Sequence, residues 1–307
     1  MKHFLSAADL TKDAALGLFR LAAELKQGLK SGHRPTPLTS RTFALIFEKP
    51  SLRTRVTFEV GINQLGGSGV YLSGHEIGLG SREPVPDVAR NLSRFVDGIV
   101  ARVFSHATIE GLARHARIPV INALSDFEHP CQAVADYFTL WERGVDLTKV
   151  KIAWVGDGNN VCHSLLLLGT ALGAEMRVAC PPGYEPDAGV LAEVRRRGGR
   201  LTTTTEPDDA VRGADVIYTD VWTSMGQEAE REKRQEAFAR YQLNPSLLGF
   251  ARSGALVMHC LPAHRGEEIT DEVLDGPQSV VFDQAENRLH SQKALLVTLM
   301  ASSTGAA

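Results

Sequence analysis

The sequence predicts an α/β protein built from two doubly wound parallel-sheet domains with a cleft between them. Short runs rich in Val and Ile alternate with stretches of helical period, which is typical of parallel strands joined by crossover helices. The alternation starts again in the second half of the chain without a detectable sequence repeat. With 307 residues, 43% of them hydrophobic and 22% charged, the chain is long enough for one large or two medium globular domains.

Apolar runs are expected to form strands in both halves of the chain: residues 43–47, 70–72, 99–103, 120–122, 152–155, 176–179, 216–220, 256–259 and 280–282. Apolar residues also repeat at i, i+4 and i+7, as on the buried face of an amphipathic helix: Phe58, Ile62 and Leu65, then Val88, Leu92 and Phe95. The loop-like break at 144–148, after the helical stretch 133–141, is where the first domain is expected to end.

Charge and cysteine usage exclude several classes of protein. The 33 Lys and Arg nearly balance the 36 Asp and Glu, giving a net charge of -3, so no general attraction to nucleic acid or to an anionic membrane is expected. Four cysteines without a Cys-x-x-Cys pair indicate neither a disulfide framework nor a zinc cage. The apolar run 165–168 is too short to span a bilayer, and the N-terminus lacks a signal-peptide pattern. We therefore expect a soluble, cytoplasmic protein.

Right-handed crossovers place ligand sites at the carboxyl ends of parallel strands, so the residues that follow each strand are the candidate site residues. The first strand is followed by Ser51-Leu52-Arg53-Thr54-Arg55 and then a helix. The free N–H groups and the dipole of a helix N-terminus attract anions, and this segment predicts a phosphate site. The alternative is an ordinary capped helix, with Ser51 as the cap and solvated arginines.

Two further strand ends in the first half carry polar residues. Arg102 lies inside an apolar run, where a charge is costly to bury without an anionic partner. The alternative is an arginine on an edge strand that reaches water. His129 and Gln132 follow the fourth strand at the start of a helix, on the side of the expected cleft. On its own, a histidine in such a place is more often a structural hydrogen-bonding group than a catalyst.

The first strand of the second half ends in Gly156 and Gly158, which invites a dinucleotide-binding interpretation. The signal is weak, because Val161 stands where the third glycine is expected and the next strand ends without an acidic residue for a ribose. Asn159 and Asn160 instead offer amides that suit a carboxylate or an amine, although asparagine is also a common helix cap.

The last two strand ends bring together an acid, a thiol and two imidazoles. One strand ends at Asp220, which alone would often be only a turn or cap residue. The other is followed by Cys260 between His259 and His264. As metal ligands these residues are poorly spaced, and a buried cysteine is usually just a small hydrophobic residue. Beside Asp220 in a cleft, they become candidate site residues.

Taken in order, four of these segments make the chain similar to the transcarbamylase family over nearly its whole length: Ser51-Leu52-Arg53-Thr54-Arg55, His129-Pro130-Cys131-Gln132, Asp220 to Gly226, and His259-Cys260-Leu261-Pro262. The third resembles the ornithine-type motif of the family because it contains Ser-Met-Gly, whereas the aspartate branch uses an arginine-containing segment. There are two departures from the family pattern. Leu52 replaces the usual Thr, and His75 stands where many relatives carry a Gln.

The resemblance implies attack of the δ-amine of ornithine on carbamoyl phosphate, giving citrulline and phosphate, a step of arginine biosynthesis, without metal or organic cofactor. Residues 1–143 would bind carbamoyl phosphate, with a C-terminal helix at about 286–307 packed back on them, and residues 144–285 would bind ornithine. The resemblance also implies a homotrimer in which the loop 73–83 reaches a neighbouring subunit, and a mobile lid at 224–226.

Family roles carry over to individual residues of this chain. The carbamoyl phosphate contacts would be Ser51, Leu52, Arg53, Thr54, Arg102, His129, Gln132, Cys260, Leu261 and Arg288. The ornithine contacts would be Asn160, Asp220, Ser224 and Met225. The catalytic group would consist of Arg102, His129, Asp220 and Cys260, with Cys260 positioning the amine rather than acting as a covalent nucleophile.

Three alternatives stay open at this point. The first is an NAD-dependent dehydrogenase built on the Gly-x-Gly segment, and the second is a catalytically silent member of the same family. The third is a carbamoyltransferase for another amine, such as putrescine or an acylated ornithine, because spacing in the sequence does not measure the length of a pocket.

Overall fold

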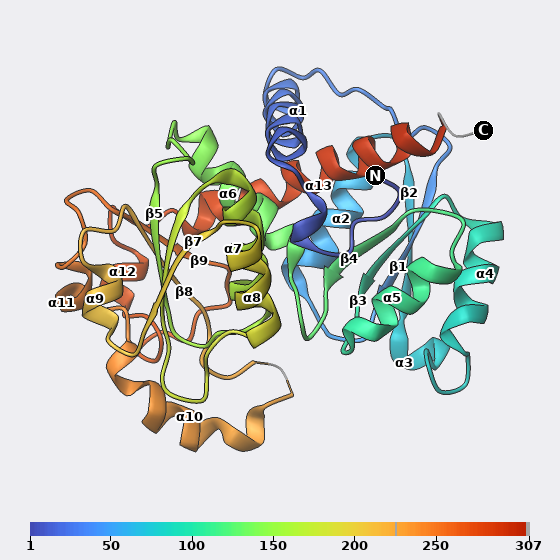
Figure 1. Cartoon of the computed structure of the whole chain (residues 1–307). Coiled ribbons are helices and arrows are strands. Elements are labelled where there is room, and N and C mark those ends of the chain that lie inside the picture. Colours follow the sequence, from blue (N-terminus) through green and yellow to red (C-terminus); the bar gives the residue numbers. More distant parts are fainter. Residues whose placement is uncertain (225, 305–307) are drawn as a thin grey trace. The chain divides into compact units, whose positions relative to one another are not determined.

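The computed structural model describes residues 1–224 and 226–304, and the chain divides into two compact units. The first unit contains Met1–Phe138 together with the chain from Glu286 onward, and the second contains Thr139–Ala285. Each unit is a parallel sheet flanked by helices (Figure 1), so the predicted α/β class with two parallel sheets is confirmed.

The sheet of the first unit has the strand order β2-β1-β3-β4, with every described pair parallel. Its strands are β1 (Thr42–Phe47), β2 (Ser68–Ser73), β3 (Gly98–Arg102) and β4 (Val120–Leu124). Its helices are η1 (Ala7–Asp9), α1 (Lys12–Lys30), α2 (Leu52–Gln64), α3 (Gly74–Ile77), α4 (Val85–Phe95), α5 (His106–His115), α6 (Pro130–Glu142), which runs past the boundary, and most of α13 (Val281–Thr304).

Burial explains these elements. The strands β3 and β4 are buried along their whole length, and so is β1 apart from its first residue, which is why they read as continuous apolar runs rather than as alternating ones. On α2 the predicted face is confirmed, since Phe58 and Ile62 are fully buried. On α4 the prediction is wrong for Phe95, which is 73% exposed. The helix ends at Phe95, whose side chain is exposed, whereas Leu92 in the same last turn packs against the core of the unit.

The sheet of the second unit has the order β7-β6-β5-β8-β9, again parallel throughout. Its strands are β5 (Lys151–Val155), β6 (Glu175–Ala179), β7 (Arg200–Thr204), β8 (Val216–Thr219) and β9 (Leu256–His259). Its helices are α7 (Asn160–Leu172), α8 (Ala188–Arg196), α9 (Pro207–Val211), η2 (Glu228–Glu230), α10 (Arg231–Phe238), η3 (Ala239–Tyr241), α11 (Pro245–Leu248) and α12 (Asp271–Leu274).

Two strand predictions in this unit need correction. The strand β7 was not predicted, because its sequence Arg-Leu-Thr-Thr-Thr is polar and it lies at the edge of the sheet, where much of it is exposed. The predicted strand 280–282 is wrong, since Val281 and Phe282 begin α13. Only Ser279, just before this run, forms an isolated bridge to β9. A short apolar run does not distinguish a strand from the buried start of a helix.

The strand orders define where ligands are expected to bind. In each sheet the chain changes direction of winding at one point, between β1 and β3 in the first unit and between β5 and β8 in the second. In open α/β sheets, ligands bind outside the carboxyl ends of the strands at such a switch point. Most of the residues selected above lie at the ends of these four strands or just after them: Ser51–Arg55, Arg102, Gly156–Asn160 and Asp220.

No helix among the described residues is long and apolar enough to cross a membrane.

Candidate active site

The loop after β1 leads into α2 through a capped helix start. Ser51 is the N-cap, and its hydroxyl accepts a hydrogen bond from the Thr54 N–H at 3.1 Å. Leu52, the first residue of the helix, is 73% exposed, so the loss of the usual Thr hydroxyl at this position is not accompanied by any buried packing. Thr54 is fully buried and faces the interior of the unit. The helix cap by Ser51, the alternative to a phosphate site, is therefore present. The cap does not exclude a phosphate site around Thr54.

Two buried arginines converge on the hydroxyl of Thr54. Arg288 Nη2, from α13, donates to Thr54 Oγ1 at 2.6 Å, and Arg102 Nη1, from the end of β3, donates to the same oxygen at 3.3 Å. Both arginines are nearly inaccessible, at 3% and 6% exposure. Arg102 is therefore not an edge-strand arginine that reaches water. Residues 54, 102 and 288, far apart in the sequence, form one cationic cluster.

His129 lies against the same cluster, at the start of α6, and is buried. Burial lowers the pKa of His129 well below its usual value, and the neighbouring guanidinium groups of Arg288, Arg102 and Arg53 lower it further. The pKa of Lys49 is also lowered, by burial and then by Arg102. The imidazole is thus neutral at physiological pH in a strongly positive environment, which is suited to a bound anion.

The lowered pKa of His129 predicts a loss of stability in acid. In the unfolded chain an ordinary histidine takes up a proton below about pH 6.5, whereas buried His129 does not, so acidification favours unfolding. Between pH 7.5 and 5.5, wild type is expected to lose about 1.4 kcal/mol more stability than His129→Gln. Chemical denaturation of both proteins at several pH values measures this difference. Parallel stability profiles would contradict it.

Gln132 presents a single unused acceptor. Its Nε2 donates to Asp136 Oδ1 at 2.8 Å, one turn further along α6, and both residues are fully buried. Since a carboxylate only accepts, this contact also fixes which end of the amide is the oxygen. That oxygen, Gln132 Oε1, is buried and has no hydrogen-bond partner among the described residues. A buried carbonyl oxygen of this kind is suited to an N–H donor from a ligand.

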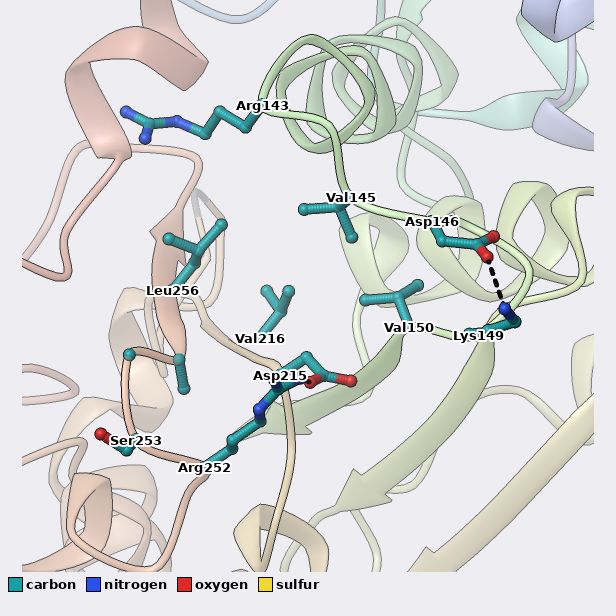
Figure 2. A pocket seen from close by; sticks show the side chains of 12 residues that line it. Arg143, Val145, Asp146, Lys149, Val150, Asp215, Val216, Arg252, Ser253 and Leu256 are labelled. Carbon is teal, nitrogen blue, oxygen red and sulfur yellow. Dashed lines mark hydrogen bonds and ion pairs between the residues drawn. The ribbon is translucent and has the colours of Figure 1, made fainter.

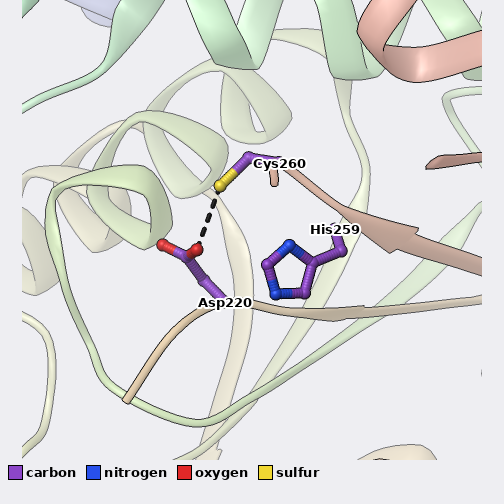
Figure 3. A group of neighbouring side chains, drawn as sticks. All are labelled: Asp220, His259 and Cys260. Atoms are coloured by element: carbon purple, nitrogen blue, oxygen red, sulfur yellow. Dashed lines mark hydrogen bonds between the residues drawn. The ribbon is translucent and has the colours of Figure 1, made fainter. Parts of the chain in front are cut away.

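In the second unit, Asp220 follows β8 and accepts hydrogen bonds from two sides. Its Oδ1 accepts from Cys260 Sγ at 3.0 Å (Figure 3), and its Oδ2 accepts from Asn159 Nδ2 at 2.8 Å. Asp220 is 6% exposed and Cys260 is 9% exposed. The acid and the thiol that the sequence placed on different strand ends are thus in contact.

Asn159 was expected either to cap a helix or to bind a ligand, and it does two things at once. Its Oδ1 accepts from the N–H groups of Val161 and Cys162 at the start of α7, while its Nδ2 contacts Asp220. Its neighbour Asn160 is half-buried in the first turn of the helix and stays a predicted ornithine contact.

Close packing of the chain itself explains the Gly-x-Gly segment. A Cβ at position 158 would overlap the backbone of Glu185 and Pro186, and the Gly158 N–H donates to the Tyr184 carbonyl at 2.9 Å. Gly156 has a φ of 133°, a conformation that favours glycine. Both glycines are therefore required by local structure, and they give no support to a dinucleotide site.

The loop after β9 has an unusual backbone. Leu261 has a φ of 56°, in the left-handed region that leucine rarely adopts. Its N–H donates to His259 Nδ1 at 2.8 Å, and His259 Nε2 lies 3.1 Å from Glu268 Oε1. His259 and Glu268 are both fully buried. Glu268 was not selected from the sequence.

Two groups of side chains have donor atoms close enough for a metal ion. The ligand atoms of Asp220, His259 and Cys260 lie within 4.8 Å of one another, but both ring nitrogens of His259 already have partners in the chain. In the second group, His264 joins Glu267, which forms an ion pair with Arg231, and Glu268. Neither group offers a set of uncommitted ligands, and the expected absence of a metal ion stays a prediction.

A buried ion pair that the sequence did not reveal supports the loop after β8. Arg234 Nη1 donates to Asp157 Oδ2 and to the Trp222 carbonyl, both at 2.9 Å. Burial raises the pKa of Asp157 to about 6, although Arg234 opposes the rise. Arg234 lies in α10, a helix dense in charged residues, and yet it is only 6% exposed. Its contact with Trp222 fixes the backbone just before Ser224, and Met225, the next predicted residue, lies outside the described residues.

A cavity of about 560 Å³ in the second unit lies at the other end of the sheet, beside the starts of β5, β8 and β9 (Figure 2). It contains none of the predicted site residues. Its cationic side chains form ion pairs with acids: Lys149 with Asp146, Arg252 with Asp215, and Arg143 with Asp283. The carboxyl ends of the strands remain the candidate site.

Comparisons with known proteins agree with this arrangement. Residues 2–142 match the family model of the aspartate/ornithine carbamoyltransferase carbamoyl-P binding domain, and residues 148–299 match the model of the Asp/Orn binding domain. The chain therefore belongs to the aspartate/ornithine carbamoyltransferase family, and it is an enzyme of this family.

Full-length relatives carry a more specific name. The chain is 51% identical to ornithine carbamoyltransferase of Archaeoglobus fulgidus, over 98% of both chains, and 52% identical to that of Methanosarcina acetivorans, over 97% of this chain and 99% of the relative. The solved structure of ornithine carbamoyltransferase from Pyrococcus furiosus matches with a TM-score of 0.94 and 50% identity, covering 98% of this chain and 97% of that one.

Proposed function

We propose that this protein transfers the carbamoyl group of carbamoyl phosphate to the δ-amine of L-ornithine, giving L-citrulline and phosphate. The observation that carries the proposal is the convergence of Arg102 and Arg288 on Thr54 at the N-terminus of α2. The similarity to ornithine carbamoyltransferases over nearly the whole chain supports ornithine as the acceptor. The first domain, residues 1–143 with the C-terminal helix, binds carbamoyl phosphate, and residues 144–285 bind ornithine.

Carbamoyl phosphate is bound at the cationic cluster. Ser51, Arg53, Thr54 and Arg288 hold the phosphate at the start of α2, and charge-assisted hydrogen bonds of this kind contribute roughly 1.5–3 kcal/mol each. The backbone at Leu52 takes part, because its side chain is exposed and offers no polar group.

Arg102 and neutral His129 act on the carbonyl group of carbamoyl phosphate. Arg102 bridges the phosphate and the carbonyl oxygen, and the imidazole donates a hydrogen bond to the same oxygen as it gains negative charge. The buried oxygen of Gln132 accepts from the carbamoyl NH2 group, and the Leu261 carbonyl is its second acceptor. Donors fixed in advance stabilise this charge without reorganisation during the reaction.

Ornithine is held by its amino-acid head group. Asp220 pairs with the α-ammonium, and its orientation is fixed by Asn159 and Cys260. Asn160, Ser224 and the Met225 backbone bind the remaining polar atoms of the head group. The δ-amine lies near Cys260 and must lose a proton, at a cost of about 4–5 kcal/mol at pH 7 for an ordinary alkyl ammonium. Alignment of the two substrates, worth roughly 7–11 kcal/mol, offsets this cost.

Replacing Cys260 tests its role as a positioning group. Cys260→Ser keeps a donor to Asp220 and is expected to retain kcat within about tenfold, while Cys260→Ala loses one hydrogen bond to a charged group and falls by about 10- to 150-fold. Steady-state kinetics measures both. A covalent nucleophile would not tolerate alanine, and a carbamoyl adduct on Cys260, found by mass spectrometry after incubation with carbamoyl phosphate, would contradict this role.

The proposal is tested by a colorimetric ureido assay with carbamoyl phosphate and four acceptors in parallel: ornithine, putrescine, acetylornithine and aspartate. Product with ornithine alone is the expected result. Product with a different amine would keep the carbamoyl phosphate site and overturn the assignment of the second domain. No product with any acceptor would favour a silent member of the family, and Leu52 and His75 would be the first residues to revert.

We also propose that the enzyme is a cytoplasmic homotrimer that serves arginine biosynthesis. An apolar stripe on the first unit supports self-association: Leu52, Val56 and Val60 are exposed at successive turns of α2, and Val70 is exposed on the edge strand β2. Light scattering is expected to give about 100 kDa, three times 33.3 kDa. The loop 73–83, with exposed His75 on α3, would then reach a neighbouring subunit. Four buried, unbridged cysteines support a reducing compartment.

A further inference from the structure

Glu268 is a fully buried carboxylate on a segment whose backbone is held on both sides. Its carbonyl accepts from the Leu243 N–H at 2.8 Å, and the carbonyl of the next residue, Ile269, accepts from the Gly266 N–H at 2.9 Å. The carboxylate itself is held by its contacts with His259 and His264. Burying a carboxylate costs free energy unless hydrogen bonds compensate for the lost water.

The carboxylate joins the two ends of the loop 260–263. Its Oε1 lies 3.1 Å from Nε2 of His259, the last residue of β9, and accepts from the His264 N–H at 2.6 Å. His259 precedes the loop and His264 follows it. One oxygen atom therefore fixes where this four-residue loop begins and where it ends.

His259 transmits this constraint into the loop. Its backbone N–H donates to Gln284 Oε1 at 3.0 Å, which anchors the residue. Its Nδ1 accepts from the Leu261 N–H, so the ring proton is on Nε2 and points to Glu268. Leu261 is thereby held in a left-handed conformation, which non-glycine residues keep only where the surrounding structure imposes it.

We propose that Glu268 and His259 are positioning residues for Leu261 and Cys260 of the active site. By holding Leu261 in this conformation, they set the direction of its carbonyl and keep the Cys260 thiol on Asp220. Neither residue contacts substrate in this role. The inference rests on the proposed function, because its readout is the transfer reaction.

Substitutions at Glu268 provide the first test. The oxygen of Glu268→Gln still accepts from both His259 and His264, and its NH2 group replaces Oε2, which has no hydrogen-bond partner among the described residues. This variant is expected to keep kcat within about threefold of wild type, whereas Glu268→Ala is expected to lower kcat by about tenfold or more and to raise the ornithine KM. The carbamoyl phosphate KM is expected to stay within about threefold for Glu268→Gln and to rise for Glu268→Ala, because the Leu261 carbonyl accepts from the carbamoyl NH2 group in the proposed site.

Substitutions at His259 separate positioning from simple filling of space. Oδ1 of His259→Asn lies where Nδ1 lies in histidine and still accepts from the Leu261 N–H, but the side chain no longer reaches Glu268. His259→Gln reaches Glu268 and fills more volume, but loses the acceptor for Leu261. Positioning predicts a higher kcat for His259→Asn than for His259→Gln, even if His259→Gln melts at the higher temperature. Equal values of kcat, or the reverse order, would overturn the proposal.

Controls separate the possible failures. Glu267→Ala removes the neighbouring acid, which pairs with Arg231, and is expected to leave kinetics unchanged. If wild type forms no citrulline, the proposed function fails and this inference falls with it. If wild type is active and all four variants match it, only the inference fails. Should Glu268→Ala not fold, Glu268→Gln and the two His259 variants still decide.

Discussion

Replacing Arg102 with methionine is expected to reduce kcat/KM for carbamoyl phosphate by about 100- to 10,000-fold. In the proposed site this arginine makes two charge-assisted hydrogen bonds, one to the phosphate and one to the carbonyl oxygen, and each contributes roughly 1.5–3 kcal/mol. Methionine keeps an unbranched side chain of similar length, so the change removes charge and donors rather than volume. Steady-state kinetics with carbamoyl phosphate varied at saturating ornithine measures the effect.

The same substitution is expected to stabilise the protein without substrate. Arg102 lies among other cations and lowers the pKa values of both His129 and Lys49, so removing its charge relieves repulsion. Thermal unfolding of the unliganded variant should therefore occur at or above the wild-type temperature. The control is Arg90→Met, an exposed arginine on α4, which is expected to leave kinetics unchanged. A variant with ordinary carbamoyl phosphate kinetics would contradict the assignment of Arg102.

Replacing Asp220 with asparagine is expected to lower kcat/KM for ornithine by about 100-fold or more. The change removes the negative charge that pairs with the α-ammonium, which accounts for roughly 1.5–3 kcal/mol. It also turns one acceptor into a donor, so that an amide NH2 faces either the Cys260 thiol or the Asn159 amide, both of which donate to Asp220 in the wild type. Kinetics with ornithine varied at saturating carbamoyl phosphate measures the loss.

Binding of phosphate should distinguish a local effect of this substitution from a general one. Phosphate binds the first domain in the proposed scheme, so calorimetry is expected to give the same affinity for Asp220→Asn and wild type. An exposed acid on α9 provides the matched control, since Asp208→Asn is expected to leave both kinetics and phosphate binding unchanged. Unchanged ornithine kinetics in Asp220→Asn would contradict the assignment of the head group.

The elements predicted well from the sequence are those whose pattern is set by burial. The strands β1, β3 and β4 are apolar because nearly every one of their residues is buried. The residues that follow strands were selected because parallel topology gathers strand ends at one edge of each sheet. The polar edge strand β7 was missed for the same reason, since exposed Thr residues carry no burial signal.

The missed parts of the candidate site depend on partners that are distant in the sequence. Arg234 and Asp157 are 77 residues apart, and in the sequence each belongs to a polar segment that is typical of a solvated surface. Glu268 follows another charged residue and gave no signal, although it is fully buried. Asn159 was weighed as a cap, and its contact with Asp220 exists only because β5 and β8 are neighbours. Such pairs become visible when tertiary packing is known.

The packing of Gly158 bears on how nucleotide-binding motifs are recognised. A glycine pair after a parallel strand is commonly taken as a mark of dinucleotide binding, where the missing side chains admit a pyrophosphate. Here the backbone at Glu185 and Pro186 takes up that space, so a search for the glycine pair alone would report a false positive. Any larger residue at 158 would push this segment away from α7, so the misleading motif is expected to persist among close homologues for purely steric reasons.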